Sequence, residues 1–287
     1  MKAASAHPVR VTVIEPTTGW RMVPWAELHA YRDLLWLMVW RDIAARYKQT
    51  ILGPMWFVVQ PLINTLVFTV IFGRVAHLST AGAPGPLFYM CGLLLWSYFS
   101  ANFSATAVTL TNNSGLFGKV YFPRLIVPLS SIVSGTVAFF IQAALFAGFY
   151  IAYKYTDAAG TYGLRPSAIF FPLVVVQVAA LSLGVGLWLA AITARFRDFT
   201  VLSGFIIQLW MYGTPIIYPL SQIPARYQWI AWVNPMTMPT ELCRWMLLGT
   251  GTISAGTVVI SVVLTVLFLV TGLMQFNRTE KTFVDII

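Results

Sequence analysis

The chain has 287 residues, of which 58% are apolar and only 9% are charged, and its formal net charge is +9. Its mean hydropathy is +0.76. Soluble domains carry about 25% charged and about 45–50% apolar residues, so this composition excludes a water-soluble globular protein. It also excludes an intrinsically disordered chain, because disorder requires low hydrophobicity. We therefore expect an all-helical bundle that crosses a membrane several times.

The first predicted element is an amphipathic helix over residues 24–53, which follows an N-terminal cytoplasmic extension over residues 1–23. One stripe of this helix is apolar at helical spacing. The residues of the stripe are Leu28, Tyr31, Leu35, Met38 and Val39. On the polar side, Asp42 and Arg46 stand four residues apart and are expected to pair. Because the helix directly precedes the first long apolar segment, we expect it to lie flat at the cytoplasmic membrane interface.

Six windows without any Asp, Glu, Lys or Arg follow, and each is long enough for the ~20 residues that a spanning helix needs. A charge at the centre of such a helix costs roughly 2.5–3.5 kcal/mol, which explains why the windows are free of charges. The predicted spans cover about residues 54–76, 87–110, 125–153, 168–193, 200–219 and 253–276. They form one membrane domain over residues 54–276, and residues 277–287 form a tail.

Six spans place both ends of the chain on the same side of the membrane. If that side is the cytoplasm, 13 of the 18 Lys and Arg residues lie inside. The five that lie outside are Arg74, Lys154, Arg165, Arg226 and Arg244. Because cations accumulate on the cytoplasmic side, we predict that both termini are cytoplasmic. The first 50 residues lack the compact apolar core of a signal peptide, so we expect the spans themselves to direct insertion.

The segment between the fifth and sixth predicted spans is too hydrophobic for an ordinary outer loop. It carries Trp229, Trp232 and Trp245, and four prolines divide it into short pieces. Backbone can break at membrane depth only where it is buried in protein or lines a cavity. We therefore expect a pair of short re-entrant helices over about residues 222–250.

Catalytic constellations are absent from this sequence. No acidic residue falls in the middle of a predicted span, and the three histidines are scattered, so we expect neither a coupling carboxylate nor a metal site. Residues 113–119 (NSGLFGK) lack the glycine spacing and the final Ser or Thr of a P-loop, so we expect no ATP site. Gly184 and Gly186 are better explained by close helix packing than by dinucleotide binding. A disulfide between Cys91 and Cys243 stays open.

Aromatic residues of the first and fifth predicted spans are candidates for the wall of a translocation channel. They are Trp56, Phe57, Phe68, Phe72, Trp210, Tyr212 and Tyr218. Aromatic rings offer flat apolar faces to sugars, while Tyr and Trp also offer hydrogen bonds. The alternative is that these rings face lipid or neighbouring helices. Three prolines, Pro61, Pro215 and Pro219, mark either static kinks or gating hinges.

Several motifs resemble ABC-2 type export permeases, and within them the polysaccharide (O-antigen) export branch. They are WRDI (40–43), RYKQTILGPMW (46–56), QPL (60–62), VFTVIFG (67–73), KVYFPR (119–124), YGTPIIYP (212–219) and NPM (234–236). The resemblance covers about residues 25–280. It implies a homodimer of six-span permeases, paired with two copies of a separate ABC ATPase. It also implies a substrate of polysaccharide linked to polyprenyl pyrophosphate and a place in the bacterial inner membrane.

The resemblance further implies which residues contact the ATPase or gate the entrance on the cytoplasmic side. They are Arg41, Asp42, Arg46, Tyr47, Lys48, Lys119, Tyr121, Phe122 and Arg124. Alternatively, the cations among them serve only as positive-inside anchors, or attract the pyrophosphate of the lipid carrier. ATP and Mg²⁺ are expected on the partner ATPase and no cofactor on this chain. Nucleic acid is not an expected partner.

Other functions stay open at this point. The same architecture could export teichoic-acid-like polymers, lipids or drugs, and its response to glycan would separate these substrates. A channel or scaffold outside the ABC class would have no ATPase partner. A membrane-embedded glycosyltransferase is the enzyme alternative, but clustered acids at a membrane face are missing.

Overall fold

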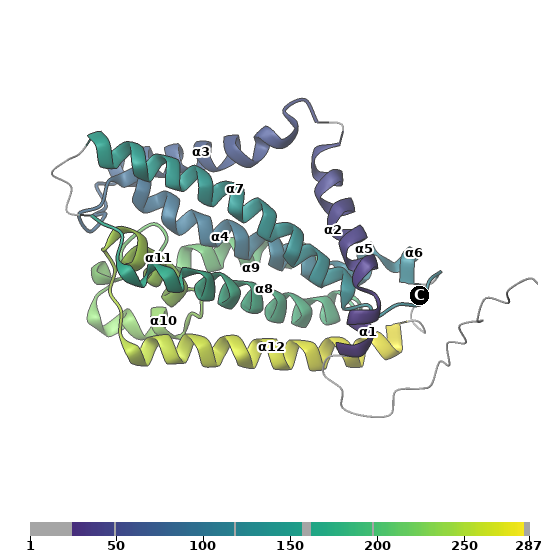
Figure 1. Cartoon of the computed structure of the whole chain (residues 1–287). Coiled ribbons are helices and arrows are strands. Elements are labelled where there is room, and N and C mark those ends of the chain that lie inside the picture. The colour runs from purple at the N-terminus through teal and green to yellow at the C-terminus, as the bar shows by residue number, and fades with distance from the viewer. Residues whose placement is uncertain (1–24, 49, 118, 157–161, 197, 284–287) are drawn as a thin grey trace, which may run out of the picture.

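The computed structural model describes residues 25–48, 50–117, 119–156, 162–196 and 198–283. The predicted extension over residues 1–23 and the end of the predicted tail, residues 284–287, lie outside the described residues. Every regular element within the described ranges is helical, as the composition predicts. Long helices run side by side along the bundle, and α2 crosses one end of it (Figure 1). We call this the α2 end and the opposite end, which holds α10 and α11, the α11 end.

Two helices, α1 (Trp25–Ala30) and α2 (Arg32–Tyr47), occupy the region of the predicted amphipathic helix. Met38 of the predicted stripe is buried on α2, which packs against α7 (Ile126–Thr156), and Leu28 of α1 is buried in the same apolar cluster. Trp36 and Trp40 face outward and are 62% and 73% exposed. The stripe therefore fastens α2 across the end of the bundle, while the position of α2 relative to a membrane stays a prediction.

The first long apolar segment begins with a 3₁₀ turn (Gly53–Met55), continues as α3 (Trp56–Phe68) and ends in a π-helical stretch, η2 (Thr69–Val75). Pro61 lies inside α3, which runs through it without interruption. The change in hydrogen-bond spacing therefore falls at η2. A hinge role for Pro61 stays a prediction.

Helix α4 (Gly85–Ala107) is the most enclosed of the long helices and continues into two short helices, α5 (Thr109–Asn112) and α6 (Ser114–Phe117). It packs against α7 and against α8 (Phe171–Thr193), which follows a 3₁₀ turn, η3 (Pro166–Phe170). A Cβ atom at Gly186 would lie 2.6 Å from the Cβ of Thr106 on α4. At Gly184 it would lie 2.6 Å from Leu269 of α12 (Ala255–Phe283). The two glycines therefore allow close helix packing, as predicted.

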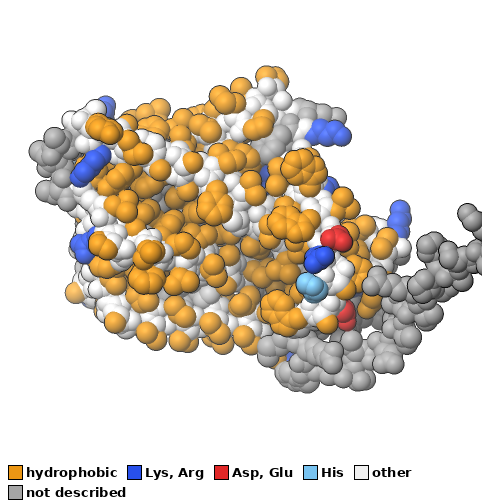
Figure 2. All heavy atoms as spheres, viewed as in Figure 1, with side chains coloured by type: hydrophobic (Ala, Val, Ile, Leu, Met, Phe, Trp, Pro, Cys, Tyr) orange, Lys and Arg blue, Asp and Glu red, His pale blue; other side chains and the backbone are white. Residues whose placement is uncertain are grey.

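Four helical segments are long and apolar enough to cross a membrane: Gly53–Val75, Ile126–Thr156, Pro166–Thr193 and Ala255–Glu280. A shorter apolar helix, α9, covers Phe199–Gly213. The predicted second and fifth spans fall on α4 and α9, so the count of six stays a prediction. Apolar side chains cover the visible face of the bundle, and charged side chains gather toward its two ends (Figure 2). That distribution is typical of a membrane protein.

Short helices fill the α11 end between α9 and α12. Two 3₁₀ turns, η4 (Leu220–Gln222) and η5 (Ala225–Tyr227), lead to α10 (Gln228–Val233) and α11 (Thr237–Leu248). Short helices were expected in this segment, and α11 packs against α4 and α8. Their depth in a membrane stays a prediction.

Candidate functional site

A cavity of about 240 Å³, with both polar and apolar lining residues, opens at the α2 end, between α2, the α4–α5 junction and the start of α7. Its lining residues are Arg41, Asp42, Ala45, Arg46, Ala105, Val108, Thr109, Asn112, Asn113, Val127 and Ser131. The predicted coupling residues Arg41, Asp42 and Arg46 therefore meet at one place. Two of these three side chains are cations, and the other polar lining groups include hydroxyls and amides.

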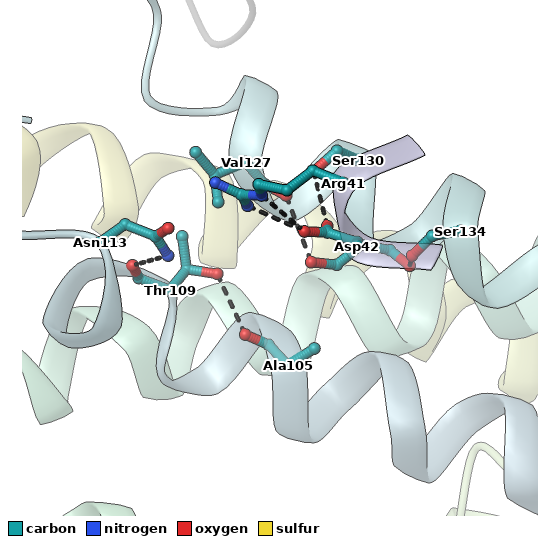
Figure 3. A network of polar contacts seen from close by, with 9 residues as sticks. Arg41, Asp42, Ala105, Thr109, Asn113, Val127, Ser130 and Ser134 are labelled. Carbon is teal, nitrogen blue, oxygen red and sulfur yellow. Dashed lines mark hydrogen bonds and ion pairs between the residues drawn. The ribbon is translucent and has the colours of Figure 1, made fainter. Parts of the chain in front are cut away.

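The carboxylate of Asp42 connects α2 to α7 (Figure 3). Arg41 donates to Asp42 Oδ1 from Nε at 3.1 Å and from Nη2 at 2.8 Å. Ser130 shares its hydroxyl hydrogen between Asp42 Oδ2 at 3.2 Å and the carbonyl of Val127 at 2.8 Å. The predicted pair between Asp42 and Arg46 is therefore wrong: among the described residues Asp42 pairs with Arg41 and accepts from Ser130 instead. Arg46 is exposed and makes no hydrogen bond or ion pair within the described part of the chain.

The other wall of the cavity consists of α5 and the residue after it. Thr109 donates its hydroxyl to the carbonyl of Ala105 at 3.2 Å. Asn113 donates from Nδ2 to the carbonyl of Thr109 at 2.9 Å, and Asn112 is exposed. An unpaired guanidinium beside neutral amides and hydroxyls can bind an anion such as a phosphate group.

The remaining predicted coupling residues of the loop between α6 and α7 form two groups, one that contacts the bundle and one that is exposed. Phe122 is 5% exposed and packs on Phe117, with ring centroids 5.7 Å apart. Arg124 donates from Nη1 to the carbonyl of Glu280 at 2.5 Å, so the loop is joined to α12. Tyr121 is 63% exposed, and Lys119 is exposed as well.

The groups around this loop change the pKa of the Tyr121 phenol. Its partial burial raises the pKa of Tyr121, and the negative charges of Glu27 and Glu280 raise it further. Tyr121 is therefore a neutral hydrogen-bond donor at physiological pH. Lys48 on the neighbouring segment is exposed, whereas the side chain of Tyr47 lies outside the described residues. The surface available to a partner at this end thus includes Arg46, Lys48, Lys119 and Tyr121.

Three of the predicted channel aromatics pack into the bundle. The rings of Phe68 and Phe72 lie 5.2 Å apart, and Phe68 also meets Tyr89 of α4 at 6.3 Å. Trp210 packs edge-on against Phe99 of α4 at 5.0 Å. Within this copy of the chain, these three rings serve helix packing.

The other predicted channel aromatics are more open. Trp56 on α3 is 44% exposed, and Tyr212 on α9 is 51% exposed. Phe57 and Tyr218 are half-buried. The hydroxyl of Tyr218 donates to the carbonyl of Tyr212 at 3.0 Å, which folds the chain back after α9. Trp56 and Tyr212 are therefore the two most exposed of the seven.

Asn234 fastens the end of α9 to the start of α11. Its Nδ2 donates to the carbonyl of Gly213 at 3.0 Å and to the hydroxyl of Thr214 at 2.9 Å. Its Oδ1 accepts from Trp210 Nε1 at 2.8 Å and from the backbone N–H of Met236 at 3.0 Å. The amide is thus fully used, and it ties the NPM motif to the YGTP motif.

Arg244 on α11 forms a second clamp on the segment that follows α9. Its guanidinium donates to the carbonyls of Pro215 at 2.5 Å and Ile216 at 2.7 Å. It also pairs with Glu241 at 3.1 Å, and both side chains are 1% exposed. The guanidinium carbon lies 3.7 Å from the ring centre of Phe88 on α4. The predicted hinge at Pro215 is therefore held by a buried charge, and Pro219 is buried as well.

This clamp was missed at the level of sequence, where Arg244 counted only as an outer cation. A signal was available, because Glu241 and Arg244 are the only charged residues between positions 227 and 277. Opposite charges three residues apart on a helix face each other. An isolated pair of this kind in an apolar stretch predicts a buried ion pair with further hydrogen bonds.

Comparison with known proteins identifies the family of this chain. The family description "ABC-2 type transporter" matches residues 33–248. An O-antigen export system permease protein RfbA of Myxococcus xanthus is 32% identical over 215 residues, covering 73% of this chain and 78% of the relative. A protein of the same name from Klebsiella pneumoniae is 26% identical over 89% of this chain and 95% of the relative.

More distant relatives include the polysialic acid transport protein KpsM of Escherichia coli, which is 24% identical over 71% of this chain and 77% of the relative. The family match contains the cavity, both clamps and every motif quoted above. The resemblance predicted from the motifs is thereby confirmed. The chain is a membrane protein that belongs to the ABC-2 type transporter family.

Proposed function

We propose that the chain is the permease subunit of an ATP-driven exporter that moves polysaccharide linked to a polyprenyl lipid across the bacterial inner membrane. The observation that carries this proposal is the similarity, over 73% and 89% of the chain, to two proteins named for O-antigen export. The relatives named for polysialic acid and capsule polysaccharide export support the same substrate class.

In this proposal α4 and α9 complete a set of six spans, and the α2 end is cytoplasmic. The described cations support that orientation. Eight lie at the α2 end: Arg32, Arg41, Arg46, Lys48, Lys119, Arg124, Arg195 and Arg278. Five lie at the α11 end: Arg74, Lys154, Arg165, Arg226 and Arg244. An excess of cations marks the cytoplasmic side.

The working unit is proposed to be a homodimer in contact with two ATPase copies. The rest of the chain covers little of the Gly53–Val75 span, which supports a second copy of the chain packed against it. Only 6% of its apolar window is buried, against 28–33% for the other three candidate spans. The ATPase would bind ATP and Mg²⁺ and contact the surface that holds Lys48, Lys119 and Tyr121. Its closure would push α2 and separate α3 and α9 of the two copies.

The cavity at the α2 end is the proposed binding place for the pyrophosphate of the lipid carrier. Asp42 is neutralised by Arg41, so the unpaired charge of Arg46 makes the cavity cationic. The exposed amide of Asn112 and the second Nδ2 hydrogen of Asn113, whose first is donated to Thr109, add neutral hydrogen-bond donors. A doubly charged headgroup needs this combination of cation and neutral hydrogen bonds.

The test is gentle purification of the chain from its native membrane, followed by reconstitution with the ATPase that co-purifies. We expect one ATPase per permease and an ATPase rate that rises with lipid-linked glycan. Arg46→Glu should leave ATP hydrolysis active but uncouple it from glycan movement. Arg32→Glu is the matched control, because Arg32 is an exposed cation of the same helix outside the cavity lining.

Two outcomes would overturn the proposal. No ATPase partner for a folded permease would favour a channel or scaffold. If glycan leaves the ATPase rate unchanged but a drug, a lipid or a teichoic-acid-like polymer raises it, the exporter has another substrate. If ATP hydrolysis stays fully coupled to glycan movement in Arg46→Glu, only the proposed role of the cavity is rejected, and the proposed export function is not.

A further inference from the structure

Three neutral amides lie on the outer faces of two apolar helices. Gln60 and Asn64 are exposed on α3, and Gln208 is exposed on α9. None of the three makes a hydrogen bond within the part of the chain that the structure describes. No charged residue occurs in α3 or α9, so these amides are the most polar exposed groups of both helices.

The depth of the amides makes this exposure costly in lipid. Asn64 follows Gly53 by 11 residues and Gln208 follows Phe199 by nine, which places both roughly 15 Å along their segments at 1.5 Å per residue. That depth is near the middle of a hydrocarbon core of about 30 Å. An amide without a partner is strongly disfavoured there. The amides therefore face water, a second protein chain or a polar substrate.

Each amide shares a helix ridge with an exposed aromatic ring. Trp56, Gln60 and Asn64 follow one another at intervals of four on α3, and Gln208 and Tyr212 do so on α9. Residues four apart lie on the same side of a helix. An amide beside an open ring offers hydrogen bonds to hydroxyls and a flat surface for C–H groups. That pair of properties matches a sugar ring rather than a hydrocarbon chain.

Both ridges belong to helices that pack against α4, which lies between α3 and α9 in the view of Figure 1. Although α4 is otherwise largely buried, it exposes Ala101 and Ser104 toward the α2 end. The next residues on that side, Ala105 and Val108, line the cavity. An open strip of small side chains therefore leads from the cavity along α4.

We propose that Gln60, Asn64 and Gln208, together with Trp56 and Tyr212, contact the hydroxyls and rings of the polysaccharide as it passes through the membrane. This inference rests on the proposed function and adds the residues that select a hydroxylated polymer. Neutral hydrogen bonds are weak enough to exchange along a moving chain, whereas a buried charge would hold one sugar in place. The absence of charge on these ridges suits a sliding polymer.

The first experiment measures whether the amide ridges face water. Gln60→Cys, Asn64→Cys and Gln208→Cys are made singly and treated in membranes, with the ATPase present, with a charged methanethiosulfonate. Leu66→Cys and Leu209→Cys are matched controls, since these leucines are 64% and 68% exposed on other sides of the same helices. The chain without added cysteine is the blank, because Cys91 and Cys243 are fully buried.

We expect the three amide positions to react at least about tenfold faster than the leucine controls, because the reactive thiolate forms only where water reaches it. Equal rates at all five positions would overturn the inference, whether the amides face lipid or a dry contact with a second copy. The proposed function would be untouched by that result.

The second experiment measures export. A triple variant Gln60→Met, Asn64→Leu, Gln208→Met removes the amides at similar volume, and Gln60→Asn, Asn64→Gln, Gln208→Asn retains them. We expect the apolar variant to lose about tenfold or more in glycan export at normal membrane level, and the amide variant to lose little, since each neutral hydrogen bond contributes a factor of about two to ten. Normal export by the apolar variant would overturn the inference. Absence of glycan export by the unaltered chain with its ATPase would instead overturn the proposed function.

Discussion

The stability of the α11 end is expected to depend on Arg244, and Arg244→Met tests this. The change removes the partner of Glu241, whose side chain is 1% exposed. It also removes the donor from the carbonyls of Pro215 and Ile216. Breaking a buried ion pair by removing one partner costs about 3–5 kcal/mol. Because neither side chain reaches solvent, we expect the free energy of unfolding to fall by that amount.

A double variant separates the orphaned charge from the lost hydrogen bonds. Glu241→Gln with Arg244→Met removes both charges. A Gln side chain keeps a carbonyl oxygen for the backbone N–H of Thr252, which now donates to Glu241 Oε2 at 2.9 Å. The remaining cost is that of carbonyls without donors, about 1–3 kcal/mol. We therefore expect the double variant to be more stable than Arg244→Met alone.

The assay is thermal unfolding in detergent, followed by the fraction of chain that stays monodisperse. Arg226→Met is the control, because Arg226 is an exposed cation at the same end that only stacks on Tyr227. An Arg244→Met chain as stable as this control would refute the reasoning. So would a double variant less stable than the single one, because the orphaned charge would then not be the main cost.

Three further predictions concern the packing of the bundle. Gly186→Leu should abolish folding, measured as membrane-inserted protein, because even its Cβ would lie 2.6 Å from the Cβ of Thr106; normal accumulation would contradict the helix contact. Oxidation by copper-phenanthroline should join Cys91 and Cys243, whose sulfur atoms lie 2.9 Å apart, with loss of the thiol labelling seen after denaturation and no dimer on a non-reducing gel. A cross-linked dimer or two free thiols would argue against that placement. Asn234→Leu should lower the free energy of unfolding by about 1–3 kcal/mol, since it removes the partner of part-buried polar groups on Trp210, Thr214 and Met236; an unchanged melting temperature would refute the clamp.

Composition and hydropathy predict an all-helical membrane bundle, because both follow from the identity of each residue and not from how the helices pack. The glycines of α8 were also predictable, since small residues in an apolar helix have few other uses. The sequence did not predict which aromatic rings point into the bundle and which point outward. Helices that are apolar on every side give no periodic signal to separate a buried face from an exposed one. The inward packing of Phe68 and the exposure of Tyr212 therefore become visible only in the fold.

Polar contacts were not predictable from local spacing alone. In place of the expected Arg46, Asp42 pairs with its neighbour Arg41 and accepts a hydrogen bond from Ser130, which is distant in the sequence and lies on α7. The clamp at Arg244 shows the same limit, since its two carbonyl acceptors lie 28 and 29 residues away. Local spacing predicts which residues can meet, while the packing of helices decides which of them do.

The two ends of the bundle differ in how firmly their polar contacts hold them. At the α11 end, Asn234 and Arg244 join the end of α9 to α11 through buried or half-buried bonds. At the α2 end, the pair of Arg41 and Asp42 is partly exposed, and such pairs contribute about 0–1 kcal/mol. The polar contacts of α2 therefore offer little resistance to a force applied to it, and the buried side chains of Met38 and Val39 supply most of its attachment. We expect α9 and α11 to move together as one body, with the displacement beginning at the α2 end.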